Sequence, residues 1–119
     1  MKTIIVCDAI HPVGFELLKK EQDINVIDAV NTPKDELLKI LGEADVAITR
    51  SSTEVNEAFL EAGKKLKAIV RAGVGVDNVD IDGCSRRGII AMNVPTANTI
   101  AAVELTMAHM LAAARSLEY

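Results

Sequence analysis

Aromatic residues are nearly absent from this chain. It contains no tryptophan, and aromatic residues make up only 3% of its 119 residues, although 50% of all residues are hydrophobic. The core must therefore be built from aliphatic side chains, as in close-packed α/β sheets. A chain of this length is expected to form one folding unit, so residues 1–119 are predicted to be a single domain.

An excess of basic residues is also missing, since the formal net charge is −4. Broad binding to nucleic acid or to an anionic membrane requires a basic surface, so neither partner is expected. Long hydrophobic runs are missing too. The apolar residues Ile4, Ile5 and Val6 are followed by Asp8, and the run is too short for a signal peptide or a membrane span. We expect a cytoplasmic protein.

Cysteine is scarce and shows no pattern. Cys7 falls in an apolar segment and Cys84 in a short predicted helix, without metal-binding spacing or a disulfide framework. We interpret both as free thiols and expect no metal site.

The sequence does have short apolar runs that alternate with amphipathic segments. The runs are Thr3–Cys7, Ile24–Ile27, Val46–Thr49, Ala68–Val70 and Ile89–Met92. This alternation predicts βαβ units. Because each crossover between parallel strands is right-handed, we expect a flavodoxin-like α/β fold: five parallel strands in the order 2-1-3-4-5 with helices on both faces.

Residues that favour helix starts and stops punctuate the connections. Thr32 is a predicted N-cap with Pro33 in the first helical position, and this helix should stop at Gly42. Asn56 and Asp80 are predicted to begin two further short helices.

The last predicted helix, over residues 99–115, is unusual because several of its faces are apolar or small. One sheet face cannot cover all of them, which favours docking on a partner that these residues do not include. The alternative is an alanine-rich helix selected only for its propensity. We expect the chain to form a homodimer through this helix.

Candidate ligand-binding residues follow the predicted strands, because parallel sheets bind ligands beyond the carboxyl ends of their strands. Four segments lie there: residues 8–12, 50–52, 71–78 and 93–95. Arg50 and Arg71 follow adjacent strands, where two guanidinium groups hold a carboxylate or phosphate. Ser51 would add a hydroxyl donor.

The turn Gly73-Val74-Gly75 is the most informative part of that edge. Two glycines after a buried strand let backbone N–H groups converge on an anion. The turn fails as a pyrophosphate-binding fingerprint, because Asn78 occupies the place of the third glycine. We therefore predict an anion or carboxylate turn, and we assign Asp77 and Asn78 to the structure of the loop.

Catalytic groups are not apparent. His11 is interpreted as a loop residue without a partner nearby in sequence, and His109 as a residue of the last helix that is either packed or faces a partner. No nucleophile with its base, pair of carboxylates or metal cluster is recognisable.

Several strings in this chain resemble the D-isomer-specific 2-hydroxyacid dehydrogenases. They are Thr49-Arg50-Ser51, the segment from Arg71 to Asp80, Arg87-Gly88-Ile89, the segment from Asn93 to Thr99 and the helix from Ala102 to Met107. The resemblance covers essentially the whole chain. It implies the flavodoxin-like substrate-binding domain of a two-domain, NAD-dependent oxidoreductase.

The resemblance also implies roles for the edge residues. Gly73, Val74 and Gly75 would offer amides to the substrate carboxylate, and Arg50 and Arg71 would address the phosphate of 3-phosphoglycerate, an intermediate of serine synthesis. Val74 would touch the nicotinamide of NAD. The Rossmann domain and the catalytic arginine, glutamate and histidine would lie outside these residues. We therefore expect this chain to be truncated, to have no catalytic residue, and to be inactive without tight NAD binding.

Other functions are left open or argued against. A glyoxylate or hydroxypyruvate reductase lobe is the alternative within the family, and a dehydrogenase-like interaction module is the alternative outside it. A phosphoacceptor receiver domain needs an aspartate where Arg50 and Ser51 stand. A flavodoxin needs a hydroxyl-rich loop after the first strand, which Ala9–Pro12 does not provide.

Overall fold

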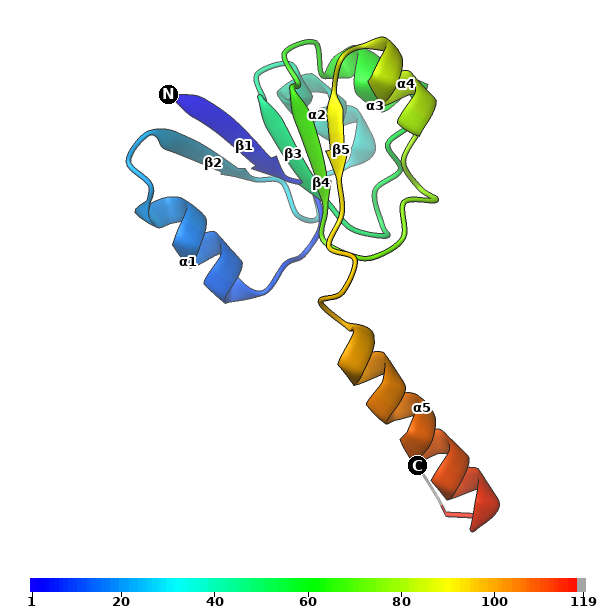
Figure 1. Cartoon of the computed structure of the whole chain (residues 1–119). Helices are drawn as coiled ribbons and strands as arrows, with labels where there is room; N and C mark the ends of the chain where they lie inside the picture. The colour runs from blue at the N-terminus through cyan, green and yellow to red at the C-terminus, as the bar shows by residue number, and fades with distance from the viewer. Residues whose placement is uncertain (118–119) are drawn as a thin grey trace.

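The computed structural model describes residues 1–117 and contains one five-stranded parallel sheet in the order β2-β1-β3-β4-β5 (Figure 1). The strands are β1 (Lys2–Val6), β2 (Ile24–Asp28), β3 (Val46–Thr49), β4 (Ala68–Arg71) and β5 (Ile90–Met92). The helices are α1 (Pro12–Lys20), α2 (Lys34–Leu41), α3 (Glu57–Ala62), α4 (Ile81–Arg86) and α5 (Thr99–Ala114). The predicted strand order is confirmed.

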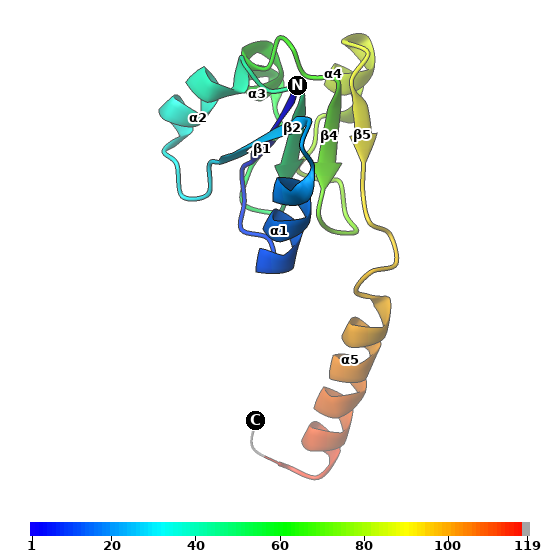
Figure 2. The ribbon, with the colours of Figure 1, turned by 90° about the vertical axis from the view of Figure 1, so that its left-hand side faces the viewer.

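The core lies between the sheet and helices α2, α3 and α4, which are grouped on one face (Figures 1 and 2). Alternate strand residues such as Ile5, Ala47 and Ile69 point into it and are buried, because successive side chains of a strand face opposite ways. Right-handed crossovers place α1 on the opposite face, since the chain moves from β1 to β2 in the other direction. α1 has no buried residue.

The face opposite the core is only partly covered. Ile90 and Met92 on the edge strand β5 are 62% and 45% exposed. α5 does not cover them, because it extends away from the sheet in both views (Figures 1 and 2). The helix was predicted over 99–115 and ends at Ala114. No helix among residues 1–117 is long and apolar enough to cross a membrane.

Two of the three predicted helix starts are confirmed. The side chain of Asn56 accepts a hydrogen bond from the Phe59 amide, and that of Asp80 accepts one from the Gly83 amide. The prediction for α2 was wrong by one residue. Pro33 itself occupies the N-cap position in an extended conformation (φ −56°, ψ 146°), so Thr32 lies outside the helix and does not cap it.

Candidate functional site

The carboxyl ends of β3 and β4 bring two predicted site segments together. Thr49 and Arg71 are partners in the parallel register, and the Ala72 amide donates to the Thr49 carbonyl at 2.8 Å. The loops that begin at Arg50 and Ala72 therefore leave the same edge of the sheet side by side. The predicted neighbourhood of these two loops is confirmed.

A buried carboxylate after β1, that of Asp8, fixes the backbone of the loop that begins at Arg50. Asp8 is only 7% exposed and accepts hydrogen bonds from the Arg50 amide (2.6 Å) and from the amide and hydroxyl of Thr53 (3.1 and 2.6 Å). The sequence placed Asp8 at this edge but gave it no role. An acidic residue directly after a buried strand was the available signal.

Asn78 fixes the same loop from the other side. Its Nδ2 donates to the carbonyls of Arg50 and Thr53 at 2.7 and 2.8 Å. The structural role predicted for Asn78 is therefore confirmed. Because Asp8 holds the amide of Arg50 and Asn78 holds its carbonyl, the Cα of Arg50 has little freedom.

A hollow of about 430 Å³ lies beside Arg50. Its wall includes Arg50, Gly73, Asn98 and also His11, which the sequence had suggested was a loop residue without a partner. His11 is instead the N-cap of α1, and its Nδ1 accepts a hydrogen bond from the Val13 amide. The Arg50 side chain turns toward the same loop, where its Nη1 donates to the Ala9 carbonyl at 3.0 Å.

Arg71 lies differently from Arg50. Its Nη1 donates to the Gly75 carbonyl, and a Cβ added to Gly73 would lie 2.9 Å from that nitrogen. Neither Gly73 nor Gly75 has a positive φ. Gly73 therefore leaves room for the guanidinium, which an added Cβ would displace. Arg71 braces the glycine turn from within and is not part of the wall of the hollow.

The glycine turn carries unpaired backbone donors. The Gly73 amide donates to the Arg71 carbonyl at 2.8 Å, whereas within residues 1–117 the amides of Val74 and Gly75 have no acceptor. The turn is also tied to the segment after β5. Asn93 Nδ2 donates to the Val74 carbonyl (2.8 Å), and the Val94 amide donates to the Gly73 carbonyl (2.9 Å). Ser51 is exposed, and in the described part of the chain its side chain makes no hydrogen bond.

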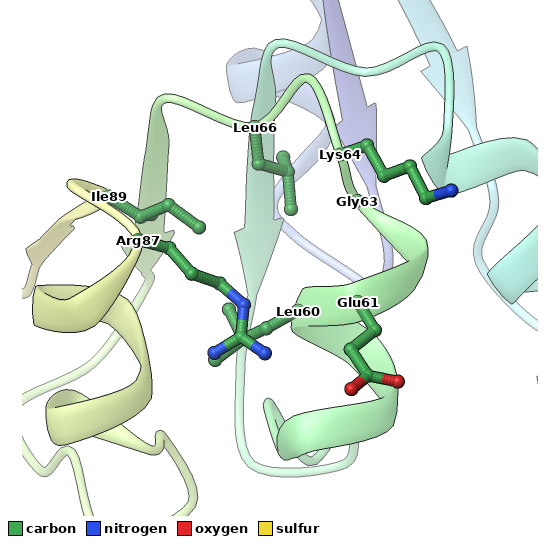
Figure 3. A pocket seen from close by; sticks show the side chains of 7 residues that line it. All are labelled: Leu60, Glu61, Gly63, Lys64, Leu66, Arg87 and Ile89. Carbon is green, nitrogen blue, oxygen red and sulfur yellow. The ribbon is translucent and has the colours of Figure 1, made fainter.

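A second hollow of about 310 Å³ opens between α3 and α4, beyond the amino ends of β4 and β5 (Figure 3). Leu60, Leu66 and Ile89 form its apolar wall. Arg87 reaches toward α3 in Figure 3, and its Nη2 is paired with the Glu57 carboxylate. Glu61, Lys64 and the paired Arg87 are the charged residues of its lining.

The two thiols are not nucleophiles at neutral pH. Burial, with a smaller effect of the Asp8 charge, raises the pKa of Cys7 to about 12, and burial also raises the pKa of Cys84. Both cysteines are buried and free, as expected. Residues 1–117 contain no group of three or more side chains suited to hold a metal ion.

The sheet order and the unpaired donors at its edge define a flavodoxin-like α/β domain with polar loops at its strand ends. A family model described as D-isomer specific 2-hydroxyacid dehydrogenase, catalytic domain, matches residues 4–117. The chain belongs to this family of oxidoreductases.

Curated relatives agree with this membership. D-3-phosphoglycerate dehydrogenase of Methanocaldococcus jannaschii is 43% identical over 98% of this chain, and hydroxypyruvate reductase of Thermotoga maritima is 40% identical over 94% of it. The chain spans only 22% and 36% of the length of these two relatives.

Solved structures agree as well. A Thermus thermophilus protein superposes with a TM-score of 0.84 at 30% identity, over 96% of this chain and 37% of that one. NAD⁺-bound 3-phosphoglycerate dehydrogenase of Entamoeba histolytica gives a TM-score of 0.77 at 30% identity, over 93% and 38%.

Proposed function

We propose that this chain is the substrate-binding lobe of an NAD-dependent D-3-phosphoglycerate dehydrogenase that acts in serine biosynthesis in the cytoplasm. The observation that carries the proposal is one edge of the sheet, where Arg50 and Gly73 line one hollow and the amides of Val74 and Gly75, next along the glycine turn, have no acceptor within residues 1–117. Such a combination of donors suits an anionic hydroxy acid.

The two ends of the ligand are assigned by the chemistry of the donors. Arg50 donates one N–H to the Ala9 carbonyl, and its other N–H groups are left for the phosphate. Arg71 holds the turn through Nη1 and lies outside the wall of the hollow, so it contributes its positive charge to the site without a direct contact, and its Nε is buried without an acceptor in the described residues. Ser51 adds a hydroxyl donor. The carboxylate is received by the turn from Gly73 to Gly75.

NAD is assigned to the complete enzyme and not to this chain alone. Val74 is 41% exposed on the turn and offers a van der Waals surface and a backbone amide to a nicotinamide ring. Residues 1–117 provide no glycine-rich loop at a helix start for the pyrophosphate, so the cofactor does not fit this lobe by itself. Hydride transfer from C2 of the hydroxy acid to NAD therefore requires a second domain that supplies the cofactor site and a base.

A glyoxylate or hydroxypyruvate reductase lobe is the second candidate, and the 40% identity to the Thermotoga maritima hydroxypyruvate reductase favours it. A ligand without phosphate uses the amide turn but has nothing to place against a second cationic group. A dehydrogenase-like interaction module would keep the fold and bind neither acid.

The decisive experiment is an NMR titration of the ¹⁵N-labelled chain with 3-phosphoglycerate and, separately, with glycolate. We expect 3-phosphoglycerate to shift the amide signals of Val74 and Gly75 at a lower concentration than glycolate does. Arg50→Met should weaken the binding of 3-phosphoglycerate at least tenfold. Arg86→Met is the matched control, because Arg86 lies on α4, paired with Glu57 away from this edge. Tighter binding of glycolate would favour the reductase, and shifts spread evenly over the surface would contradict both.

The chain alone is expected not to reduce NAD in the presence of 3-phosphoglycerate, because the catalytic groups and domain closure are assigned to the second domain. Absorbance at the wavelength of NADH measures this directly. Turnover by the purified 119 residues would contradict the assignment of the catalytic groups to a second domain.

A further inference from the structure

His11 occupies two positions in the fold at once. It is the N-cap residue of α1, and it also forms part of the wall of the hollow beside Arg50. Asparagine, aspartate, serine and threonine are the residues preferred for capping, and histidine is not among them. A histidine that caps a helix at a ligand-sized hollow therefore suggests a second role for its ring.

The cap determines which ring nitrogen carries the proton. Pro12 has no N–H, so the first free amide of α1 belongs to Val13, and it donates to His11 Nδ1 at 3.2 Å. An Nδ1 that accepts a hydrogen bond cannot also carry a proton, so in the neutral ring the proton lies on Nε2. Within residues 1–117 this Nε2–H has no acceptor.

The loop that carries His11 is fixed relative to Arg50. Arg50 Nη1 donates to the Ala9 carbonyl two residues before the histidine. Ile10 packs on α1, where a Cβ added to Gly14 would lie 3.1 Å from Ile10 Cδ1. The Arg50–Ala9 hydrogen bond therefore ties the guanidinium to the loop that carries the imidazole, and both side chains line the same hollow.

We propose that His11 is a further ligand-contacting residue, whose Nε2–H donates to an oxyanion of the phosphorylated hydroxy acid. The inference rests on the proposed function, because it takes the ligand to be bound at the edge of β3 and β4. The ring adds a directional donor to the hollow that Arg50 and Gly73 also line. It thereby favours ligands that carry an oxyanion within reach of His11 while they are bound at Arg50.

The test separates the contact from the cap. Asparagine is a good N-cap, so His11→Asn keeps an acceptor for the Val13 amide, while its shorter side chain leaves no donor at the position of the imidazole Nε2–H. We expect His11→Asn to leave the circular dichroism and the urea midpoint near wild type and to weaken 3-phosphoglycerate about tenfold, as for loss of a hydrogen bond to a charged group. His11→Ala, which removes both, should bind as weakly and also be less stable.

Two further measurements locate the contact. Long-range ¹H–¹⁵N spectra of the free wild-type chain should show the Nε2–H tautomer of His11, and 3-phosphoglycerate should shift that ring. Separate titrations with inorganic phosphate and with D-glycerate show whether His11 contacts the phosphate or the carboxylate of the ligand. The probe that carries the contacted group should bind more weakly to His11→Asn than to wild type, and the other probe should bind equally to both.

The outcomes distinguish this inference from the proposed function. If Arg50→Met loses 3-phosphoglycerate while His11→Asn binds as wild type, His11 is only a cap and the inference is wrong. The Nδ1–H tautomer would also overturn it. If the wild-type chain does not bind 3-phosphoglycerate, or if Arg50→Met binds it unchanged, the proposed function falls and this inference falls with it.

Discussion

Arg50 shows that a sequence can reveal the position of a candidate site residue without revealing the contacts that hold it. The sequence placed it correctly at the end of β3, because the apolar run that precedes it stops abruptly. It did not reveal the Asp8 carboxylate on the Arg50 amide or the Asn78 side chain on the Arg50 carbonyl. Those contacts join residues 42 and 28 positions apart in the chain, and no local pattern encodes them.

Arg71 shows where sequence reasoning stops. The sequence suggested two equivalent guanidinium groups at one edge, and it explained Gly73 by backbone freedom and by the absence of a side chain that would block an anion. In the structure Arg71 lies against the turn, and Gly73 leaves room for its guanidinium, because a Cβ would meet Nη1 at 2.9 Å. Which way a long side chain folds depends on its local packing, and that packing is not visible in the sequence.

Gly73→Ala is predicted to weaken 3-phosphoglycerate binding about fivefold without unfolding the chain. The added methyl group displaces the Arg71 guanidinium from the Gly75 carbonyl, and the loss of one hydrogen bond has roughly this effect. Gly42→Ala is the control, because its Cβ would meet nothing closer than 3.7 Å in a helical conformation. Equal affinities of the two variants, measured by NMR titration, would show that Arg71 does not shape the turn.

Asp45 is predicted to make the chain sensitive to acid. Its carboxylate accepts a hydrogen bond from the Thr3 amide at 2.9 Å, and this bond, with smaller effects of Lys2, Lys65 and Lys67, lowers the pKa of Asp45 from its ordinary value of 3.8. Because the folded pKa is the lower one, the stabilisation is complete above pH 3.8 and is lost as the pH falls through the folded pKa.

Asp45→Asn should therefore reduce the free energy of unfolding at pH 7 and flatten its decline in acid. Urea titrations at pH 7, 4 and 3, followed by circular dichroism, measure both effects. Asp23→Asn is the control, since Asp23 is exposed and its side chain makes no hydrogen bond in the described residues. A constant difference between wild type and Asp45→Asn at all three pH values would contradict the assignment.

At the scale of single elements, strands were more predictable than helix starts. Every predicted strand exists, and the bounds differ by no more than one residue at either end, because β-branched runs bounded by polar residues are a strong local signal. The start of α2 was misplaced, because both Thr32 and Pro33 favour a helix start and only the tertiary fold decides between them. α1 was expected only as an amphipathic gap, and its histidine cap was missed.

The two polar residues at the starts of α2 and α3 lead to opposite predictions. Asn56→Ala should lower the free energy of unfolding by about 1 kcal/mol, because its side chain accepts a hydrogen bond from the Phe59 amide at 3.1 Å. Thr32→Ala should have little effect, because Thr32 does not cap α2. Urea denaturation of the two variants side by side measures the difference. Equal losses would mean that Thr32 caps the helix in solution.

At the scale of the molecule, α5 is the element that the rest of the fold leaves without a role. It runs for 16 residues away from the sheet, and its apolar side chains are exposed, among them Ile100 at 73% and Leu111 at 64%. Helices of this length are marginal in water unless they pack against something. The sequence predicted the apolar character of this helix, but the direction in which it leaves the sheet depends on the short segment after β5.

One stripe along α5 has the spacing of a helix-pairing seam. The stripe consists of Ile100, Val103, Met107, Met110 and Ala114, which are separated alternately by three and four positions, as in heptad a and d sites. Met107 lies in the middle of this seam. In an antiparallel pair with two-fold symmetry, each Met107 therefore lies beside the Met107 of the second copy.

We predict that the chain forms a two-fold dimer through this seam at tens of micromolar concentration. Met107→Glu should make it monomeric, because the symmetry places two carboxylates against each other at the centre of the interface. Leu105→Glu is the matched control, since Leu105 is 60% exposed but lies outside the seam. Light scattering after size exclusion gives the mass, and circular dichroism of both variants checks the fold. A wild-type monomer would contradict the prediction, and a dimer that survives Met107→Glu but not Leu105→Glu would place the contact on the opposite side of the helix.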